Sequence, residues 1–316
     1  MSVFLAKRLA TLIATLIAIS IVVFAVMNIL PGDPAMVILG LESTEDARAA
    51  LREQLGLNAP AHIRYFQWVG GVLTGDFGIS YTYDLPVATL ILERLPVTVP
   101  LAILSMILTV LLALILGTFA ASNHNRPGDW GVMAFAQLGI AIPNFWLAIL
   151  LIIVFAVNLR LVPTGGFPGW ENGIWPAFRA LILPSIALAL VQAAILARIT
   201  RSSLLEVMRQ DFVRTARAKG LSKLATLRRH VLQNGMIPVV TVGGLQFANL
   251  MTGTIVVENL MYLPGLGRLI FQSISNRDLP TVQALVLLFA VLVVLVNFLV
   301  DLIYSRLDPR LTGQDA

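Results

Sequence analysis

The residues that could do chemistry are few and scattered in this 316-residue sequence. The three histidines, His62, His124 and His230, are far apart and lack the spacing of metal ligands. The chain contains no cysteine, no Gly-x4-Gly-Lys phosphate loop and no Gly-x-Ser-x-Gly nucleophile elbow. We therefore predict that it has no catalytic residue, no metal site and no ATPase site of its own.

The most informative segment is the basic stretch from Arg198 to His230. Asp211 is placed to cap the N-terminus of a short helix, Gly220 to end it, and Ser222 to cap the next one. This pattern predicts a helix of about nine residues from Asp211 to Lys219. So short a helix is marginal alone in water, and it therefore needs a surface to pack against.

Two kinds of surface could receive this helix. Its apolar face holds Phe212, Val213 and Ala216, and its polar sides hold Arg214, Arg217 and Lys219. The basic residues suit an anionic lipid leaflet as well as a groove on a cytoplasmic protein. Small residues at Thr215, Ala216 and Ala218 favour close approach of a protein, but the residues alone leave both surfaces open.

Polar residues within long apolar stretches are candidates to line a path through a membrane: Gln137, Asn144, Gln192, Gln246 and Asn249. Hydrogen bonding between helices is the commoner role of such residues, so both roles stay open. We place a single acid within an apolar stretch, at Asp301 near the end of the last one. Proton- or ion-driven transporters use ionisable residues inside the membrane, so their scarcity favours an external energy source.

These residues must be positioned by helices that span a membrane. The chain is 58% hydrophobic and only 12% charged, with a mean hydropathy of +0.86, whereas a soluble domain carries about 25% charged residues. A span needs roughly 20 apolar residues. Six such runs occur: Leu9–Leu30, Val97–Ala121, Trp130–Leu159, Ala180–Ala197, Val231–Val257 and Leu279–Val300. The fourth is the shortest, and Pro143 and Pro238 predict that the third and fifth bend or begin outside the membrane core.

Orientation and domain organisation follow from charge and from the spacing of the runs. Placing the N-terminus inside puts most of the 22 Lys and Arg residues on the inner side, which predicts an all-α polytopic protein with both termini inside. We expect three parts: residues 1–30 with the first helix, an outer insert at 31–96, and a five-helix core at 97–316 that carries the loop 198–230. Aromatic residues give the insert enough apolar surface to pack on the membrane face or on a partner: Tyr65, Phe66, Trp68 and Phe77.

The loop carries a family resemblance. Arg214-Thr215-Ala216-x3-Gly220 is similar to the Glu-Ala-Ala-x3-Gly loop of binding-protein-dependent ABC importer permeases, with Arg214 in place of the first glutamate. That departure is usual in the dipeptide/oligopeptide/nickel branch. Further short motifs of that branch occur in the expected order: Leu30-Pro31-Gly32-Asp33-Pro34, Gly75-Asp76-Phe77-Gly78, Arg94-Leu95-Pro96-Val97-Thr98, Pro264-Gly265-x-Gly267, Arg277-Asp278 and Leu307-Asp308-Pro309-Arg310. Their joint order resembles the first permease of the pair.

The resemblance implies a type I ABC importer permease fold with six transmembrane helices in a bacterial inner membrane. A sister permease would share the translocation path, two ATP-binding subunits would hold ATP and Mg, and an extracytoplasmic substrate-binding protein would deliver the substrate. This chain itself would contact membrane lipid and bind no cofactor and no nucleic acid. The resemblance assigns ATPase coupling to Asp211, Arg214, Thr215, Ala216, Arg217, Ala218, Lys219, Gly220 and Leu221, with a minor second contact at Ser122–Asp129.

The substrate stays open within this branch. Dipeptides and oligopeptides are the commonest substrates, and nickel chelates, glutathione, opines and sugars are the alternatives. A secondary transporter or channel is a more distant alternative, and a membrane enzyme or scaffold is a third. These last two predict intramembrane charge pairs or a clustered polar site, which the sequence does not display.

Overall fold

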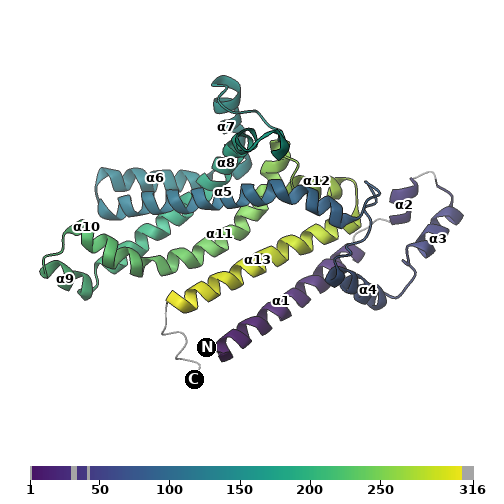
Figure 1. The fold of residues 1–316 in the computed structure, drawn as a ribbon, viewed down its shortest axis with the longest axis horizontal. Helices are drawn as coiled ribbons and strands as arrows, with labels where there is room; N and C mark the ends of the chain where they lie inside the picture. Colours follow the sequence, from purple (N-terminus) through teal and green to yellow (C-terminus); the bar gives the residue numbers. More distant parts are fainter. Residues whose placement is uncertain (1, 30–33, 41–42, 308–316) are drawn as a thin grey trace. The chain divides into compact units, whose positions relative to one another are not determined.

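The computed structural model describes residues 2–29, 34–40 and 43–307. The regular secondary structure of these residues is helical, apart from one isolated bridge between Ile79 and Pro86. The α-helices in chain order (Figure 1) are α1 (Ser2–Ile29), α2 (Pro34–Leu39), α3 (Glu45–Gln54), α4 (Ala61–Thr74), α5 (Val87–Ser122), α6 (Pro127–Ala141), α7 (Asn144–Leu151), α8 (Ile174–Met208), α9 (Asp211–Ala218), α10 (Lys223–Thr226), α11 (Leu232–Leu260), α12 (Leu266–Ser275) and α13 (Leu279–Leu307). Two π-helical segments, Ile152–Asn158 and Leu227–Val231, extend α7 and precede α11.

The chain forms two compact units, which are described separately. The first holds Val99–Leu263 and the chain from Val296 onwards, and the second holds Ser2–Thr98 with Pro264–Leu295. The expected division into an N-terminal part, an outer insert and a five-helix core concerns the membrane topology, so it stays a prediction. The motifs at Leu30–Asp33 and Asp308–Arg310 lie outside the described residues.

Five helices in the described part are long and apolar enough to cross a membrane, and a bent pair makes a sixth if it is one span. The helix pair is Pro127–Ala141 with Asn144–Asn158, which meet at an angle of 107°. The bend falls at Pro143, as predicted, because proline has no N–H to donate and its ring opposes a continuous helix. At Pro238 the helix α11 continues without a break, and the alternative that the fifth span begins outside the membrane core stays a prediction.

The fourth predicted span proves to be the most buried of the candidate helices. The predicted run Ala180–Ala197 is the middle of α8, which extends from Ile174 to Met208, and 72% of its most apolar window is buried. Within the first unit, α8 packs against α6, α7 and α11. Its central position explains the short apolar run: small residues, Arg198 and Arg201 replace the long lipid-facing stretch of a peripheral helix.

The core between α5, α8 and α11 depends on close helix approach. Ala113, Leu196, Ala197 and Val239 form a buried cluster there. At Gly117 of α5, a Cβ would stand 2.6 Å from the Thr200 Cβ and 2.8 Å from the Ala197 carbonyl oxygen. Glycine at this position therefore lets the backbones of α5 and α8 approach, as small residues do where membrane helices pack.

In the second unit, the aromatic residues of α4 pack on α1. The rings of Tyr65 and Trp68 lie 5.4 and 6.0 Å from that of Phe24, and Ser20 and Tyr65 share a hydrogen bond of 2.8 Å. Part of the apolar surface of the predicted insert therefore covers the first helix of its own chain. Phe66 remains 69% exposed.

A second contact of this unit joins the segment before α5 to the start of α13. Asp278 is fully buried and precedes α13, where its carboxylate accepts hydrogen bonds from the Ser80 hydroxyl, the Tyr81 N–H and the Thr281 hydroxyl. Burial raises the pKa of the Tyr81 phenol, and the nearby Asp278 carboxylate adds to this shift. The Asp278 contact therefore ties residues that are 198 positions apart in the sequence.

Candidate functional site: the α9 segment

The predicted short helix in the basic loop is confirmed as α9, Asp211–Ala218. Its N-cap differs from the prediction: Gln210 occupies this position with extended dihedrals and no side-chain hydrogen bond, and Asp211 is the first helical residue. Asp211 there places a negative charge at the positive end of the helix dipole. Its contact with Arg214, at 3.4 Å and fully on the surface, contributes little.

The end of α9 is built as predicted around Gly220. Its φ of +90° lies in the left-handed region that favours glycine. The Gly220 N–H donates to the Arg217 carbonyl at 3.0 Å, and the Leu221 N–H donates to the Ala216 carbonyl at 3.3 Å. These two bonds form a Schellman motif. Ser222 then caps α10 by accepting from the Ala225 N–H, as predicted, so the loop reverses sharply after α9.

The predicted apolar face of α9 is wrong in one respect: two of its three residues are buried and the third is not. Val213 and Ala216 are 3% and 8% exposed, and Val213 belongs to a core cluster with Ala121, Leu204 and Val231 of the same chain. Phe212 is 45% exposed instead. The apolar stripe thus fixes α9 to its own bundle, which meets the need of a short helix for tertiary packing.

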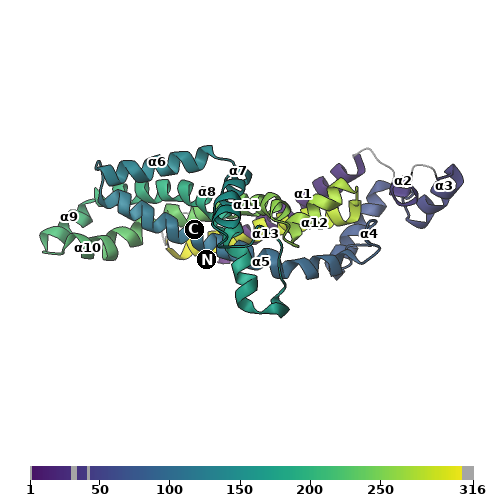
Figure 2. The same cartoon turned by 90° about the horizontal axis from the view of Figure 1, so that it is seen from above.

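The opposite face of α9 is open. Asp211, Thr215 and Ala218 lie on it at helical spacing, flanked by Phe212 and Arg214, and all five are exposed. Thr215 and Ala218 are small, so another surface can approach the backbone of α9 closely. Both views of the fold place α9 beside α10 at one end of the first unit (Figures 1 and 2). Arg217, Lys219 and Leu221 complete the predicted coupling set, and the first two are exposed.

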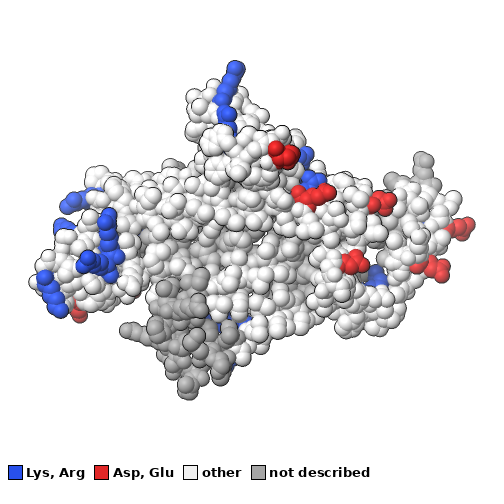
Figure 3. Space-filling model, in the orientation of Figure 1, with Lys and Arg blue, Asp and Glu red and all other residues white. Residues whose placement is uncertain are grey.

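Basic residues surround this open face. In Figure 3, Lys and Arg side chains gather at the end of the unit where α9 and α10 lie. The exposed basic residues of this end include Arg209, Arg214, Arg217, Lys219, Lys223, Arg228 and Arg229. A groove of about 410 Å³ lies beside α9 and is lined by residues that include Met208, Arg217 and Leu224. The surface therefore combines positive charge with a rigid, capped helix.

A buried ion pair supports the same end of the unit. Asp129, in the first turn of α6, is fully buried, and its carboxylate accepts from the Arg201 guanidinium of α8 at 2.5 and 2.7 Å. The Asn125 N–H and the ring of His124 also contact this carboxylate, at 2.9 and 3.3 Å. The predicted second contact, Ser122–Asp129, is thereby tied to α8, the helix that leads into α9. The sequence shows an acid and a basic residue 72 positions apart, so it carries no signal that they meet.

Four of the five candidate path residues fall on three helices that contact one another, α7, α8 and α11. The fifth, Gln137, lies on α6 and is exposed. The Asn144 amide nitrogen lies near Gly253 of α11, and the Asn249 amide donates to Gln246 at 3.0 Å. Gln192 and Gln246 are each 3% exposed, and the Gln192 Oε1 accepts no hydrogen bond. Their role as path residues stays a prediction, because these contacts are also those of helix packing.

One buried acid was missed. Glu258 is fully buried near the end of α11, beyond the predicted limit of the fifth span at Val257. The prediction that Asp301 is the single acid within the membrane spans stays a prediction, because Glu258 lies one residue outside the predicted fifth span. The helix α11 continues beyond the apolar run to Leu260, so Glu258 belongs to the helix without belonging to the predicted span. The side chain of Asp301 lies outside the described residues.

Long apolar helices around a buried α8, with a capped basic helix at one end, define a polytopic membrane protein with a docking element. Comparison with known families gives the particular family. Residues 113–313 match the binding-protein-dependent transport system inner membrane component, and residues 1–102 match the N-terminal domain of such membrane components. The chain belongs to this family. It is therefore a non-catalytic inner-membrane component of an ABC importer that works with ATPase and binding-protein partners.

Relatives match over nearly the whole chain. A peptide transport system permease protein of Brucella suis, itself a provisional assignment, is 42% identical over 98% of this chain and 99% of its own length. The glutathione transport system permease protein GsiC of Salmonella choleraesuis is 43% identical over 96% of this chain and 97% of its own. Among solved structures, an amino acid ABC transporter chain shares the fold, with a TM-score of 0.50 and 18% identity over 69% of this chain and 94% of that one.

Proposed function

We propose that this chain is the permease subunit of an ATP-driven importer of dipeptides or oligopeptides, and that α9 docks into a groove of a cytoplasmic ATPase subunit. The observation that carries the proposal is the division of α9 into two faces. Val213 and Ala216 hold the helix on its own bundle, while Thr215, Ala218 and Arg214 remain exposed. A lipid leaflet would be expected to receive the apolar residues instead, and two of the three, Val213 and Ala216, are already covered by the bundle.

Coupling requires that α9 move with the bundle. The Schellman motif at Gly220 fixes the end of α9, and Val213 anchors it to residues from α5 and α8. A push on the exposed face would therefore reach α8 as a movement of packed side chains. The ion pair between Asp129 and Arg201 would carry the same movement to α6.

The remaining partners complete the assembly that we propose. A sister permease would share the translocation path with Asn144, Gln192, Gln246 and Asn249, and two ATP-binding subunits would each receive one short helix. Both termini would lie in the cytoplasm, and the chain would contact membrane lipid but no nucleic acid. The spans provide too few charged groups for an ion-driven mechanism, which supports energy from ATP.

Peptide is proposed as the substrate because relatives from Brucella and Sinorhizobium are named peptide permeases. Glutathione, itself a small peptide, is the second candidate, because GsiC is similarly close to this chain. Uptake by the assembled complex in proteoliposomes distinguishes the two. Transport of a non-peptide solute without peptide transport would contradict both.

The coupling proposal is tested by ATPase activity in nanodiscs that hold the whole complex, with and without substrate-loaded binding protein. Gly220→Arg adds a long charged side chain at the end of α9 and strains a backbone with φ of +90°. Gly220→Asn is the matched control, since asparagine tolerates this conformation. We expect assembly in both and loss of stimulation in the first alone. Stimulation that survives Gly220→Arg unchanged would count against docking at α9.

A further inference from the structure

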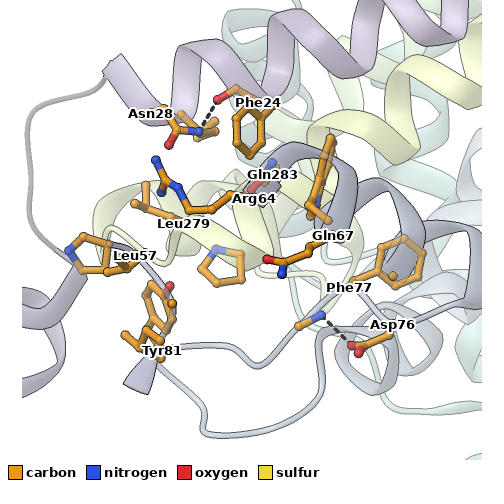
Figure 4. Close-up of a pocket in the computed structure, with 18 of the residues that line it drawn as sticks. Phe24, Asn28, Leu57, Arg64, Gln67, Asp76, Phe77, Tyr81, Leu279 and Gln283 are labelled. Atoms are coloured by element: carbon orange, nitrogen blue, oxygen red, sulfur yellow. Dashed lines mark hydrogen bonds between the residues drawn. The ribbon is translucent and has the colours of Figure 1, made fainter. Parts of the chain in front are cut away.

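The second unit contains a pocket of about 760 Å³ that the transport scheme does not use. Its lining comes from the end of α1, from α4 and the start of α13, and also from α2, the end of α3 with the connection to α4, and the segment that follows α4. Figure 4 shows it with Phe24 and Asn28 from α1, and with Leu279 and Gln283 from α13. We call it the Arg64 pocket, after the α4 residue that extends into it. Its volume is that of a site for a small organic ligand.

Two buried nitrogen atoms in this pocket lack a hydrogen-bond partner. They are the Nε of Arg64 and the Nε2 of Gln283. A buried donor without an acceptor costs about 1–3 kcal/mol, so proteins rarely keep one without a reason. Figure 4 shows Arg64 extending towards Asn28, whose amide nitrogen donates to the Phe24 carbonyl at 2.7 Å. Both unpartnered atoms are closed to solvent in this conformation, so a ligand would first contact the outer nitrogens of the Arg64 guanidinium, for which a carboxylate is the best acceptor.

A carboxylate of the protein lies on another side of the same pocket. Asp76 follows α4, and its Oδ1 accepts from the Gly78 N–H at 2.9 Å. Asp76 lies away from Arg64, with Gln67 between these two residues in Figure 4. Asp76 is exposed, so its second oxygen is accessible to a ligand. The pocket thus offers a cation and an anion at separate places.

A second arginine of the lining, Arg52, is already paired with Glu45 at 3.0 Å. Aromatic rings supply much of the remaining wall: Phe24, Trp68, Phe77 and Tyr81. Such rings bury the apolar body of a ligand, while a few placed polar groups fix its ends. A cation, an anion and apolar walls together match a zwitterion with an apolar side chain. An isolated anion would gain nothing from Asp76, and an apolar ligand would leave Arg64 unsatisfied.

We propose that the Arg64 pocket binds a short zwitterionic peptide, with its C-terminal carboxylate on Arg64 and Gln283 and its ammonium group on Asp76. The pocket chemistry carries this inference, which needs neither the coupling role of α9 nor a particular transported substrate. The site would hold a peptide on the permease itself, outside the candidate path residues of the first unit.

The test is calorimetric titration of the complex in nanodiscs, without ATP and without the binding protein. The probes are alanyl-phenylalanine, its C-terminal amide and its N-acetyl derivative. Each modification removes one charged end, so each is expected to bind about tenfold more weakly. No detectable binding of the free dipeptide at millimolar concentration would overturn the proposal.

Two variants separate this pocket from any other peptide site. Arg64→Gln is expected to weaken the free dipeptide about tenfold and to leave the affinity of the amide nearly unchanged. Asp76→Asn keeps the oxygen that accepts from Gly78, so it preserves the turn; it should weaken the free dipeptide but not the N-acetyl form. Arg160→Gln, an exposed arginine of the first unit, is the control and should change nothing. Equal effects of each variant on all probes would overturn the assignment of the two ends.

Discussion

Arg201 of α8 donates two hydrogen bonds to the buried carboxylate of Asp129 at the start of α6, at 2.5 and 2.7 Å. Bidentate contacts of this kind fix the relative orientation of two helices as well as their separation. The Asp129 side chain is 1% exposed and that of Arg201 is 19% exposed, so solvent screens the pair only partly. This pair therefore joins Ser122–Asp129, the proposed minor ATPase contact, to α8, the helix that leads into α9.

Removing one partner of this pair should destabilise the protein. Asp129→Ala leaves the Arg201 charge partly buried without its acceptor, which we expect to lower the free energy of unfolding by about 3 kcal/mol. Unfolding in sodium dodecyl sulfate, followed by tryptophan fluorescence, measures this loss of unfolding free energy. The double variant Asp129→Ala with Arg201→Ala should lose less than the sum of the two single losses. Additive losses would show that the pair has no coupling energy.

The two faces of α9 should respond differently to substitution. Val213→Ala removes buried methyl groups and should cost about 2 kcal/mol of stability, because Val213 belongs to the core cluster. Thr215→Arg, on the open face, should leave the unfolding transition unchanged and abolish the stimulation of ATPase activity. Both properties are measured on the same nanodisc preparation. If Thr215→Arg retains full stimulation, the open face is not the docking face.

The close approach of α5 and α8 should not tolerate a methyl group at Gly117. Gly117→Ala places a Cβ 2.6 Å from the Thr200 Cβ and 2.8 Å from a backbone oxygen, and we expect a loss of about 1–3 kcal/mol. Gly131→Ala in α6 is the matched control, because nothing lies within 4 Å of its added Cβ. That change should be neutral or should stabilise α6 by about 0.5–1 kcal/mol. Equal effects of the two changes on detergent unfolding would contradict the close approach.

The buried Asp278 contact should be sensitive to loss of the carboxylate. Its two oxygens accept from the Ser80 hydroxyl, the Tyr81 N–H and the Thr281 hydroxyl. Asp278→Ala leaves these donors without an acceptor, so we expect a loss of about 2–4 kcal/mol. Ser80→Ala removes a single donor and should cost less. Limited proteolysis between α4 and α5, at sites near Tyr81, measures how far this segment loosens. Equal cleavage of both variants and the unmodified chain would refute a stabilising role of the Asp278 carboxylate.

Stability at high pH should depend on Tyr81. A pKa raised in the folded state means that the folded protein favours the neutral phenol, so this contribution is complete below the ordinary value of 10.0 and is lost as the pH rises above it. The difference in unfolding free energy between the unmodified chain and Tyr81→Phe should therefore be constant up to about pH 9 and should change above pH 10. A difference that stays constant to pH 11 would refute the raised pKa.

Much of this protein follows from its sequence, because the signals are local. Long apolar runs predict spans, since any 20-residue segment in lipid must satisfy its own backbone hydrogen bonds as a helix. The short loop helix was predicted from Gly220 and Ser222, whose conformations and caps are decided by neighbouring residues. The bend at Pro143 is local for the same reason.

Only the tertiary structure decided which surfaces are covered. The sequence could not divide the apolar residues of α9, because Val213 is buried by partners from α5 and α8 that are distant in the chain, whereas Phe212 remains 45% exposed. It could not pair Asp129 with Arg201 or find the buried Glu258, and it showed the middle of α8 only as the shortest of the six apolar runs. Burial and ion pairing depend on which helices become neighbours, and this is set by packing between segments far apart in the sequence.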